Sequence, residues 1–147
     1  MYENYAKAAL KDPRYKEPAG KIFNTAMQMV KKLDEKPPAR QTNEYSLYKL
    51  IRALMRVQYA RQYEAGGNEL KAADYYRQSV LEVTEGIVSA RVGLDWLPES
   101  LLMAGDAYEK LSLNEAAKNV YKQVSIFYEG SKWAAESKKR LDLLPAS

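Results

Sequence analysis

The chain has 147 residues, of which 46% are hydrophobic and 29% are charged, a balance that predicts one globular domain rather than a disordered segment. It contains no cysteine and no histidine, which excludes disulfides and cysteine nucleophiles and removes the most common general base and the usual zinc ligands. We therefore expect no enzymatic activity, no cofactor and no metal site.

The net charge of +4 is unevenly distributed along the chain. Residues 1–62 carry 13 Lys and Arg against 6 Asp and Glu, whereas residues 63–147 carry 10 against 13. A basic half attracts nucleic acid or acidic partners, but no basic run exceeds three residues, which favours an ordinary solvated surface. No apolar run approaches the roughly 18 residues of a membrane span, and the charged N-terminus does not resemble a signal peptide.

Apolar residues recur at helical spacing along most of the chain, beginning with KIFNTAMQMVKKL at 21–33. Pro37 and Pro38 end this first pattern, because proline cannot continue a helix. A second helical pattern, over 43–65, ends at Gly66 and Gly67, because glycine commonly ends helices. The predicted helices span residues 21–33, 43–65, 68–86, 98–111, 115–128 and 131–144.

The starts of the later helices carry recognisable local signals. Asn68, Asn114 and Ser131 are expected to cap the helices that follow them, and Pro98 suits a first helical turn. Residues 87–96 fit either an extra turn of helix or a loop. No segment alternates convincingly like a strand, so we predict an all-α fold of antiparallel helix pairs joined by short turns.

Residues 98–130, PESLLMAGDAYEKLSLNEAAKNVYKQVSIFYEG, resemble a tetratricopeptide repeat (TPR), a helix–turn–helix unit of about 34 residues. Ala104 is smaller than usual for its position, and Glu129 stands where the family usually has proline. The other family positions fit, counting Pro98 as the first. Positions four, seven, eight, eleven, twenty, twenty-four and twenty-seven are Leu101, Ala104, Gly105, Tyr108, Ala117, Tyr121 and Val124.

A weaker match spans residues 53–86, although Arg56 occupies a position where the family has a large apolar residue. Tyr76 and Tyr121 are 45 residues apart, so about 11 residues are inserted relative to a standard repeat, and we place them around 86–96. We also predict a partial repeat over 1–15 and a capping helix over 131–144. The resemblance implies an α-solenoid of about seven helices forming one domain over 1–147. If the first helix of the partial repeat is missing, the chain is either a fragment of a longer array or a domain whose N-terminal helix is a cap. The weaker repeat has Ala60, Tyr63, Ala72 and Tyr76 at positions eight, eleven, twenty and twenty-four.

Gly105 lies in the middle of a predicted helix, where glycine costs about 1 kcal/mol relative to alanine. In the repeat, its position faces the second helix of the same hairpin, near Ala117 and Tyr121. A side chain there is expected to push the two helices apart, so close packing offsets the low helix propensity.

The C-terminal repeat boundary resembles the repeat junction of bacterial envelope TPR proteins, of the outer-membrane assembly lipoprotein and cell-division coordinator types. This resemblance favours the bacterial periplasm or envelope slightly over the cytoplasm, with the chain as a mature or excised domain. The matching residues are Phe127, Tyr128, Gly130, Ser131, Ala134 and Ala135.

In this superfamily the first helices of successive repeats line a concave groove that holds a peptide or a partner helix. The resemblance therefore implies a non-catalytic protein–protein scaffold or adaptor, in which the asymmetry of charge orients the partner segment in the groove. Asp106 and Glu109 would repel a C-terminal carboxylate, so the carboxylate-binding branch of the family does not fit. The implied groove residues are Leu54, Val57, Arg61, Glu64 and Ala65, followed by Glu99, Leu102, Asp106, Glu109 and Lys110.

Two rival interpretations remain open. Lys49, Arg52 and Arg56 form a basic stripe close to Tyr45 and Tyr48, which suits nucleic acid or an acidic partner. No nucleic-acid motif accompanies it, which argues against nucleic acid. Alternatively, an open repeat end stacks on another copy and gives a homo-oligomer.

The two tryptophans flank the clearest repeat. Trp96 is either an exposed anchor for a partner or a staple for its own loop, and both interpretations stay open. Trp133 is expected to pack the last helix onto residues 115–128.

Overall fold

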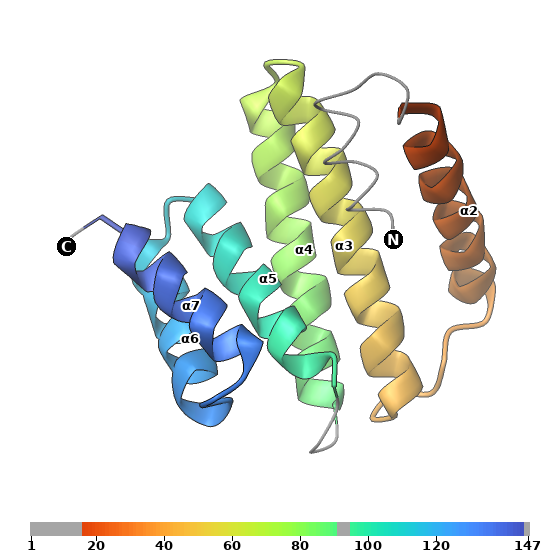
Figure 1. Ribbon diagram of the computed structural model, residues 1–147. Coiled ribbons are helices and arrows are strands. Elements are labelled where there is room, and N and C mark those ends of the chain that lie inside the picture. Colours follow the sequence, from red (N-terminus) through yellow and green to blue (C-terminus); the bar gives the residue numbers. More distant parts are fainter. Residues whose placement is uncertain (1–15, 91–94, 146–147) are drawn as a thin grey trace. The chain divides into compact units, whose positions relative to one another are not determined.

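The computed structural model describes residues 16–90 and 95–145, and these form helices and no strand (Figure 1). The all-α prediction is confirmed. The described part of the chain has six helices rather than about seven, and the partial repeat expected over 1–15 lies outside it. The helices are α2 (Lys16–Glu35), α3 (Asn43–Ala65), α4 (Glu69–Ser89), α5 (Leu97–Lys110), α6 (Asn114–Phe127) and α7 (Lys132–Leu143).

The chain divides into two compact units, Met1–Pro37 and Pro38–Ser147, where the sequence predicted one domain. The described part of the first unit contains α2, and the second contains α3 to α7. No helix in the described ranges is both long enough and apolar enough to cross a membrane.

Local side chains set most helix starts in the second unit. Asn68 accepts a hydrogen bond from the backbone N–H of Lys71, and Ser131 accepts one from Ala134, as their sequence positions predict. The predicted cap at Asn114 is wrong, because Asn114 is already the first residue of α6 and Leu113 precedes it without a side-chain cap.

The two turns that join α3 to α4 and α5 to α6 have the same construction. The N–H of Asn68 donates to the carbonyl of Tyr63, and the N–H of Leu113 donates to that of Tyr108. The residue before each donor has a positive φ, at Gly67 in one turn and Ser112 in the other. This shared turn places Leu113 at the cap, one residue before the asparagine.

The ambiguous segment contributes three residues to α4, which continues to Ser89 instead of ending at residue 86. Ala90 is its C-cap, and residues 91–94 lie outside the described ranges. Pro98 is buried in the first turn of α5, as expected.

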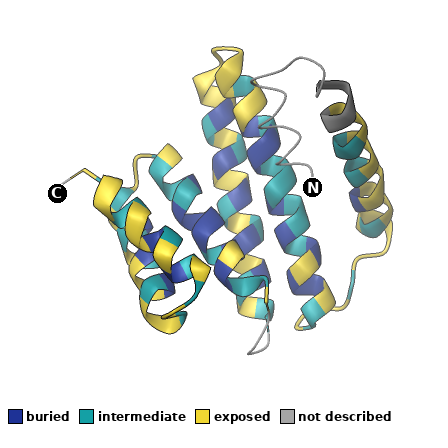
Figure 2. Cartoon of the chain, in the orientation of Figure 1, coloured by how far each residue is buried: buried dark blue, intermediate teal, exposed yellow. Residues whose placement is uncertain are grey.

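Each helix of the second unit packs against the next one along the chain, and α5 also contacts α7. The directions of α3 to α7 alternate in Figure 1, and Figure 2 shows buried and exposed positions alternating along each helix. Two hydrophobic clusters result. The first, from α3, α4 and α5, contains Leu50, Ala53, Val57, Ala60, Ala72, Tyr76, Val83, Met103, Ala104 and Ala107, and the second, from α5 and α6, contains Leu102, Ala117, Tyr121 and Val124.

Glycine allows the closest helix crossings in this unit. A Cβ atom added at Gly105 would lie 2.9 Å from Cδ1 and Cζ of Tyr121 and closer still to Cε1. A Cβ at Gly86 would lie 3.1 Å from Cβ of Lys49 and from the carbonyl oxygen of Ser46. The expected contact between Gly105 and the second helix of its hairpin is therefore confirmed.

Candidate functional site

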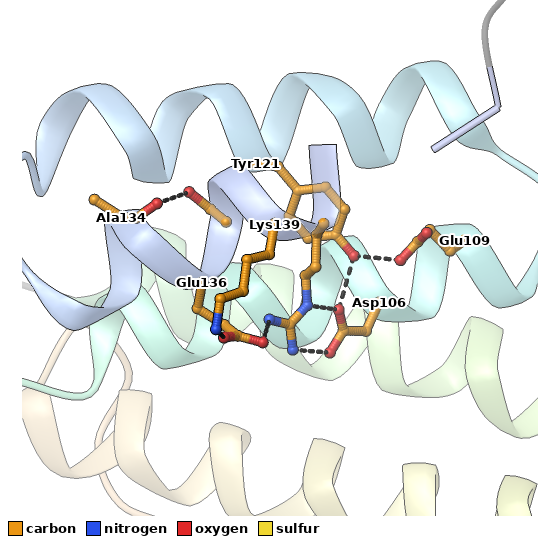
Figure 3. A network of polar contacts seen from close by, with 8 residues as sticks. Asp106, Glu109, Tyr121, Ala134, Glu136 and Lys139 are labelled. Atoms are coloured by element: carbon orange, nitrogen blue, oxygen red, sulfur yellow. Dashed lines mark hydrogen bonds and ion pairs between the residues drawn. The ribbon is translucent and has the colours of Figure 1, made fainter. Parts of the chain in front are cut away.

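Polar side chains of α5, α6 and α7 meet in one connected network (Figure 3). Arg140 donates to both carboxylate oxygens of Asp106, from Nε at 2.5 Å and from Nη2 at 3.0 Å, and its Nη1 donates to Glu136 at 2.6 Å. The Tyr121 hydroxyl lies 2.7 Å from Asp106 and 2.6 Å from Glu109, so its single proton serves either carboxylate.

Tyr121 is fully buried, with its hydroxyl at the edge of the hydrophobic cluster. Burial, reinforced by the carboxylates of Asp106 and Glu109, raises the pKa of Tyr121. The phenol therefore remains a hydrogen-bond donor, and it ties α6 to α5 where Arg140 ties α7 to α5.

A second network joins α3, α4 and α5. Glu64 accepts a hydrogen bond from the Tyr76 hydroxyl at 3.0 Å and from Nζ of Lys110 at 2.7 Å. The Lys110 ammonium also lies 5.9 Å from the centre of the Tyr76 ring. The hydrogen bond from Lys110 holds the pKa of Glu64 below its usual range, whereas burial and the bond to Glu64 raise the pKa of Tyr76 to about 12.

The tyrosine–glutamate hydrogen bond at the centre of each network repeats along the chain with a spacing of 45 residues. Glu64 and Glu109 are 45 residues apart, and so are their hydrogen-bond donors Tyr76 and Tyr121. In both networks a cation binds an acidic residue two helices earlier in the chain. Lys110 of α5 binds Glu64 of α3, and Arg140 of α7 binds Asp106 of α5. The face built by α3, α5 and α7 is therefore crossed by ion pairs within the protein itself.

The predicted groove residues fall into three groups. Val57 and Leu102 are buried in the two hydrophobic clusters, which corrects their assignment to a partner-binding groove. Their side chains point between helices, because α4 packs against the side of α3 that carries Val57 and α6 packs against the side of α5 that carries Leu102. Leu54, Asp106 and Glu109 are half-buried, whereas Arg61, Glu64, Glu99 and Lys110 are exposed.

Sequence reasoning missed Arg140 and Glu136, because the last helix was assigned to capping alone. The sequence KKRLDLL offers a signal only after α7 is placed beside α5, where Arg140 reaches Asp106 across 34 residues.

Glutamates of α4 pair with two of the three cations of the basic stripe. Lys49 binds Glu82 at 2.8 Å and Glu85 at 2.7 Å, and Nε of Arg52 donates to Glu82 at 2.8 Å. The Lys49 and Arg52 side chains are only 14% and 20% exposed, and Arg56 lies over the ring of Tyr75. Two of the three cations of this stripe are therefore paired within the protein itself, which weakens the nucleic-acid or acidic-partner interpretation.

The structure favours one of the two interpretations of Trp96. Its indole N–H donates to Oγ of Ser46 at 3.3 Å, and the ring packs, partly buried, against the first hydrophobic cluster. Trp96 therefore fastens the segment before α5 onto α3. Trp133 packs against the second cluster, as predicted.

In the described part of the chain, no group of three or more Asp and Glu residues is arranged to hold a metal ion. Every buried side-chain nitrogen and oxygen atom there has a hydrogen-bond partner. No family model, curated protein or solved structure matches this chain.

Proposed function

We propose that the chain is a non-catalytic scaffold of the TPR-like α-solenoid type, which binds a peptide or helix of another protein. The observation that carries this proposal is the hydrogen bond from tyrosine to glutamate that recurs with a 45-residue offset, at Tyr76–Glu64 and Tyr121–Glu109. A recurring contact between equivalent positions supports two copies of one structural unit.

Packing between the helices supports the same repeat. Ala72 and Ala117 are equivalent under the 45-residue offset, and both are buried where the two helices of a hairpin cross. Ala60 and Gly105 are likewise equivalent, small and buried. The offset exceeds a standard repeat by about 11 residues. The longer α4 and the segment before α5 account for this excess.

The face of α3, α5 and α7 is the binding surface in this proposal. Its internal ion pairs hold three helices in fixed positions, so little conformational entropy is lost when a partner binds. Arg61 and Glu99 lie on these helices, are exposed, and form none of the hydrogen bonds or ion pairs of the two networks, although the charge of Arg61 helps to lower the pKa of Glu64. Their opposite charges would orient the bound segment. The resemblance of the C-terminal boundary supports a partner in a bacterial envelope assembly.

Selection of peptides from a displayed random library, followed by fluorescence anisotropy, tests the proposal. Arg61→Glu and Glu99→Lys should each weaken the selected peptides about tenfold, because each reverses a charge that orients the ligand. Lys122→Glu, on the outer side of α6, is the matched control and should leave affinity unchanged. Binding that survives both groove substitutions would show that this face is not the site.

A further inference from the structure

The outer face of α4 carries a line of exposed residues, of which the first four are Leu70, Asp74, Arg77 and Leu81, and Val88, 80% exposed, continues it on the same side. Leu70 and Leu81 are 84% and 66% exposed, and the side chains of Asp74 and Arg77 are 66% and 62% exposed. At 100° per residue these positions lie within about 60° of one another around the helix, and they extend about 16 Å along it. Asp74 and Arg77 form an ion pair with each other at 2.8 Å.

The first four residues of this line are complementary to themselves when reversed. The order is leucine, acid, base, leucine, and both the two leucines and the two charges are symmetric about the point between residues 75 and 76. An antiparallel second copy, related by a two-fold axis through that point, would place its Leu81 against Leu70. The same axis would place its Arg77 against Asp74, twice.

The equivalent face of α6 keeps the base and the second apolar residue, since Arg77 corresponds to Lys122 and Leu81 to exposed Ile126, but it lacks the first leucine and the acid. Under the 45-residue offset, Leu70 corresponds to Glu115 and Asp74 to Asn119, and both α6 residues are exposed. Leu70 and Asp74 are therefore not needed to pack a hairpin of this kind.

We propose that the chain forms a symmetric dimer through the outer face of α4, with a second copy of itself as the partner. The charges select this occupant, because each copy supplies both the acid and the base that the other requires. A single helix face buries less area than a standard interface, so the dimer is weak and reversible. It differs from end-to-end stacking, since it leaves both ends of the helix array and the face of α3, α5 and α7 free.

Sedimentation velocity from about 10 µM to about 500 µM tests the dimer at low and high salt. The wild-type chain should show a concentration-dependent increase in sedimentation coefficient that weakens as salt rises. Asp74→Arg and Arg77→Asp should each reduce the association constant at least about tenfold, because each places like charges across the axis. Lys122→Asp makes a similar charge change on α6 and should not alter association.

Mixing the two single variants gives the sharpest test. Asp74→Arg supplies two cations and Arg77→Asp supplies two anions, so an equimolar mixture should associate about as well as the wild type. The double variant with both changes restores the complementary order and should dimerise too. Circular dichroism establishes that each variant is folded. A wild-type chain that remains monomeric would overturn the proposal, and so would single variants that still self-associate or a mixture that does not associate.

Discussion

Replacement of Gly105 by alanine tests how closely α5 and α6 approach. The added methyl group would overlap the ring of Tyr121, with Cδ1 and Cζ only 2.9 Å away. The ring has little room to move, because it is fully buried and its hydroxyl is held by Asp106 and Glu109. Either the two helices separate or the ring gives up those hydrogen bonds.

Three contributions set the size of the effect. Alanine returns about 1 kcal/mol of helix propensity. Overpacking of a close contact costs about 1–3 kcal/mol. Loss of a hydrogen bond to a carboxylate adds about 1.5–3 kcal/mol. We therefore expect Gly105→Ala to lower the free energy of unfolding by about 2 kcal/mol and Tm by about 4–8 °C.

Urea unfolding followed by circular dichroism measures this loss, with Gly20→Ala as the control. Gly20 is exposed in α2 and has no atom within 4 Å of an added Cβ, so that substitution should stabilise α2 through helix propensity. In a Tyr121→Leu background the cost of Gly105→Ala should largely disappear, because the obstructing ring is gone. A neutral Gly105→Ala, or an equal cost in both backgrounds, would refute the packing argument.

Two further predictions concern the networks. Burial, with the hydrogen bond to Glu64, raises the pKa of Tyr76 to about 12, whereas an unfolded tyrosine titrates near 10. The unfolded chain therefore loses this proton first, and stability should fall as pH rises from about 10 to about 12. Tyr76→Phe should remove that part of the decline in urea titrations at stepped pH, and an unchanged slope would contradict the assignment. Arg140→Met should weaken the attachment of α7 to α5 by about 1 kcal/mol, because it removes a bidentate pair that is partly exposed. Hydrogen exchange should then speed up in α7 and not in α3 or α4, while Lys139→Met, whose side chain is 75% exposed, should leave exchange unchanged.

Signals contained within a few residues predicted the helices well. The predicted helix over 43–65 has the bounds observed for α3, and Asn68 and Ser131 cap the helices that follow them. The error at Asn114 arises because asparagine is a general cap signal. The position of the cap is decided by the turn, where Leu113 donates to the carbonyl of Tyr108.

The candidate site was harder to predict, because its contacts join residues far apart in the chain. Periodicity places Lys49 and Arg52 on one stripe of α3, but it does not show that Glu82 lies opposite them, 33 and 30 residues later. In the same way, the position of a residue within a repeat does not show how deeply its side chain is buried. Val57 and Leu102 lie near the groove in the family pattern, and here both are enclosed by neighbouring helices.

The networks also change what the charged face can recognise. Tyr76 and Tyr121 place buried rings between helices and bring their hydroxyls to the edge, where an acceptor must be supplied. The acceptors come from α3 and α5 as Glu64, Asp106 and Glu109, so these carboxylates already serve the fold. A partner that competed for them would leave buried hydroxyls unpaired, at about 1–3 kcal/mol each. In the proposed scaffold, recognition must therefore rest on exposed charges that form no hydrogen bond in the networks, which is why Arg61 and Glu99 test it and Asp106 does not.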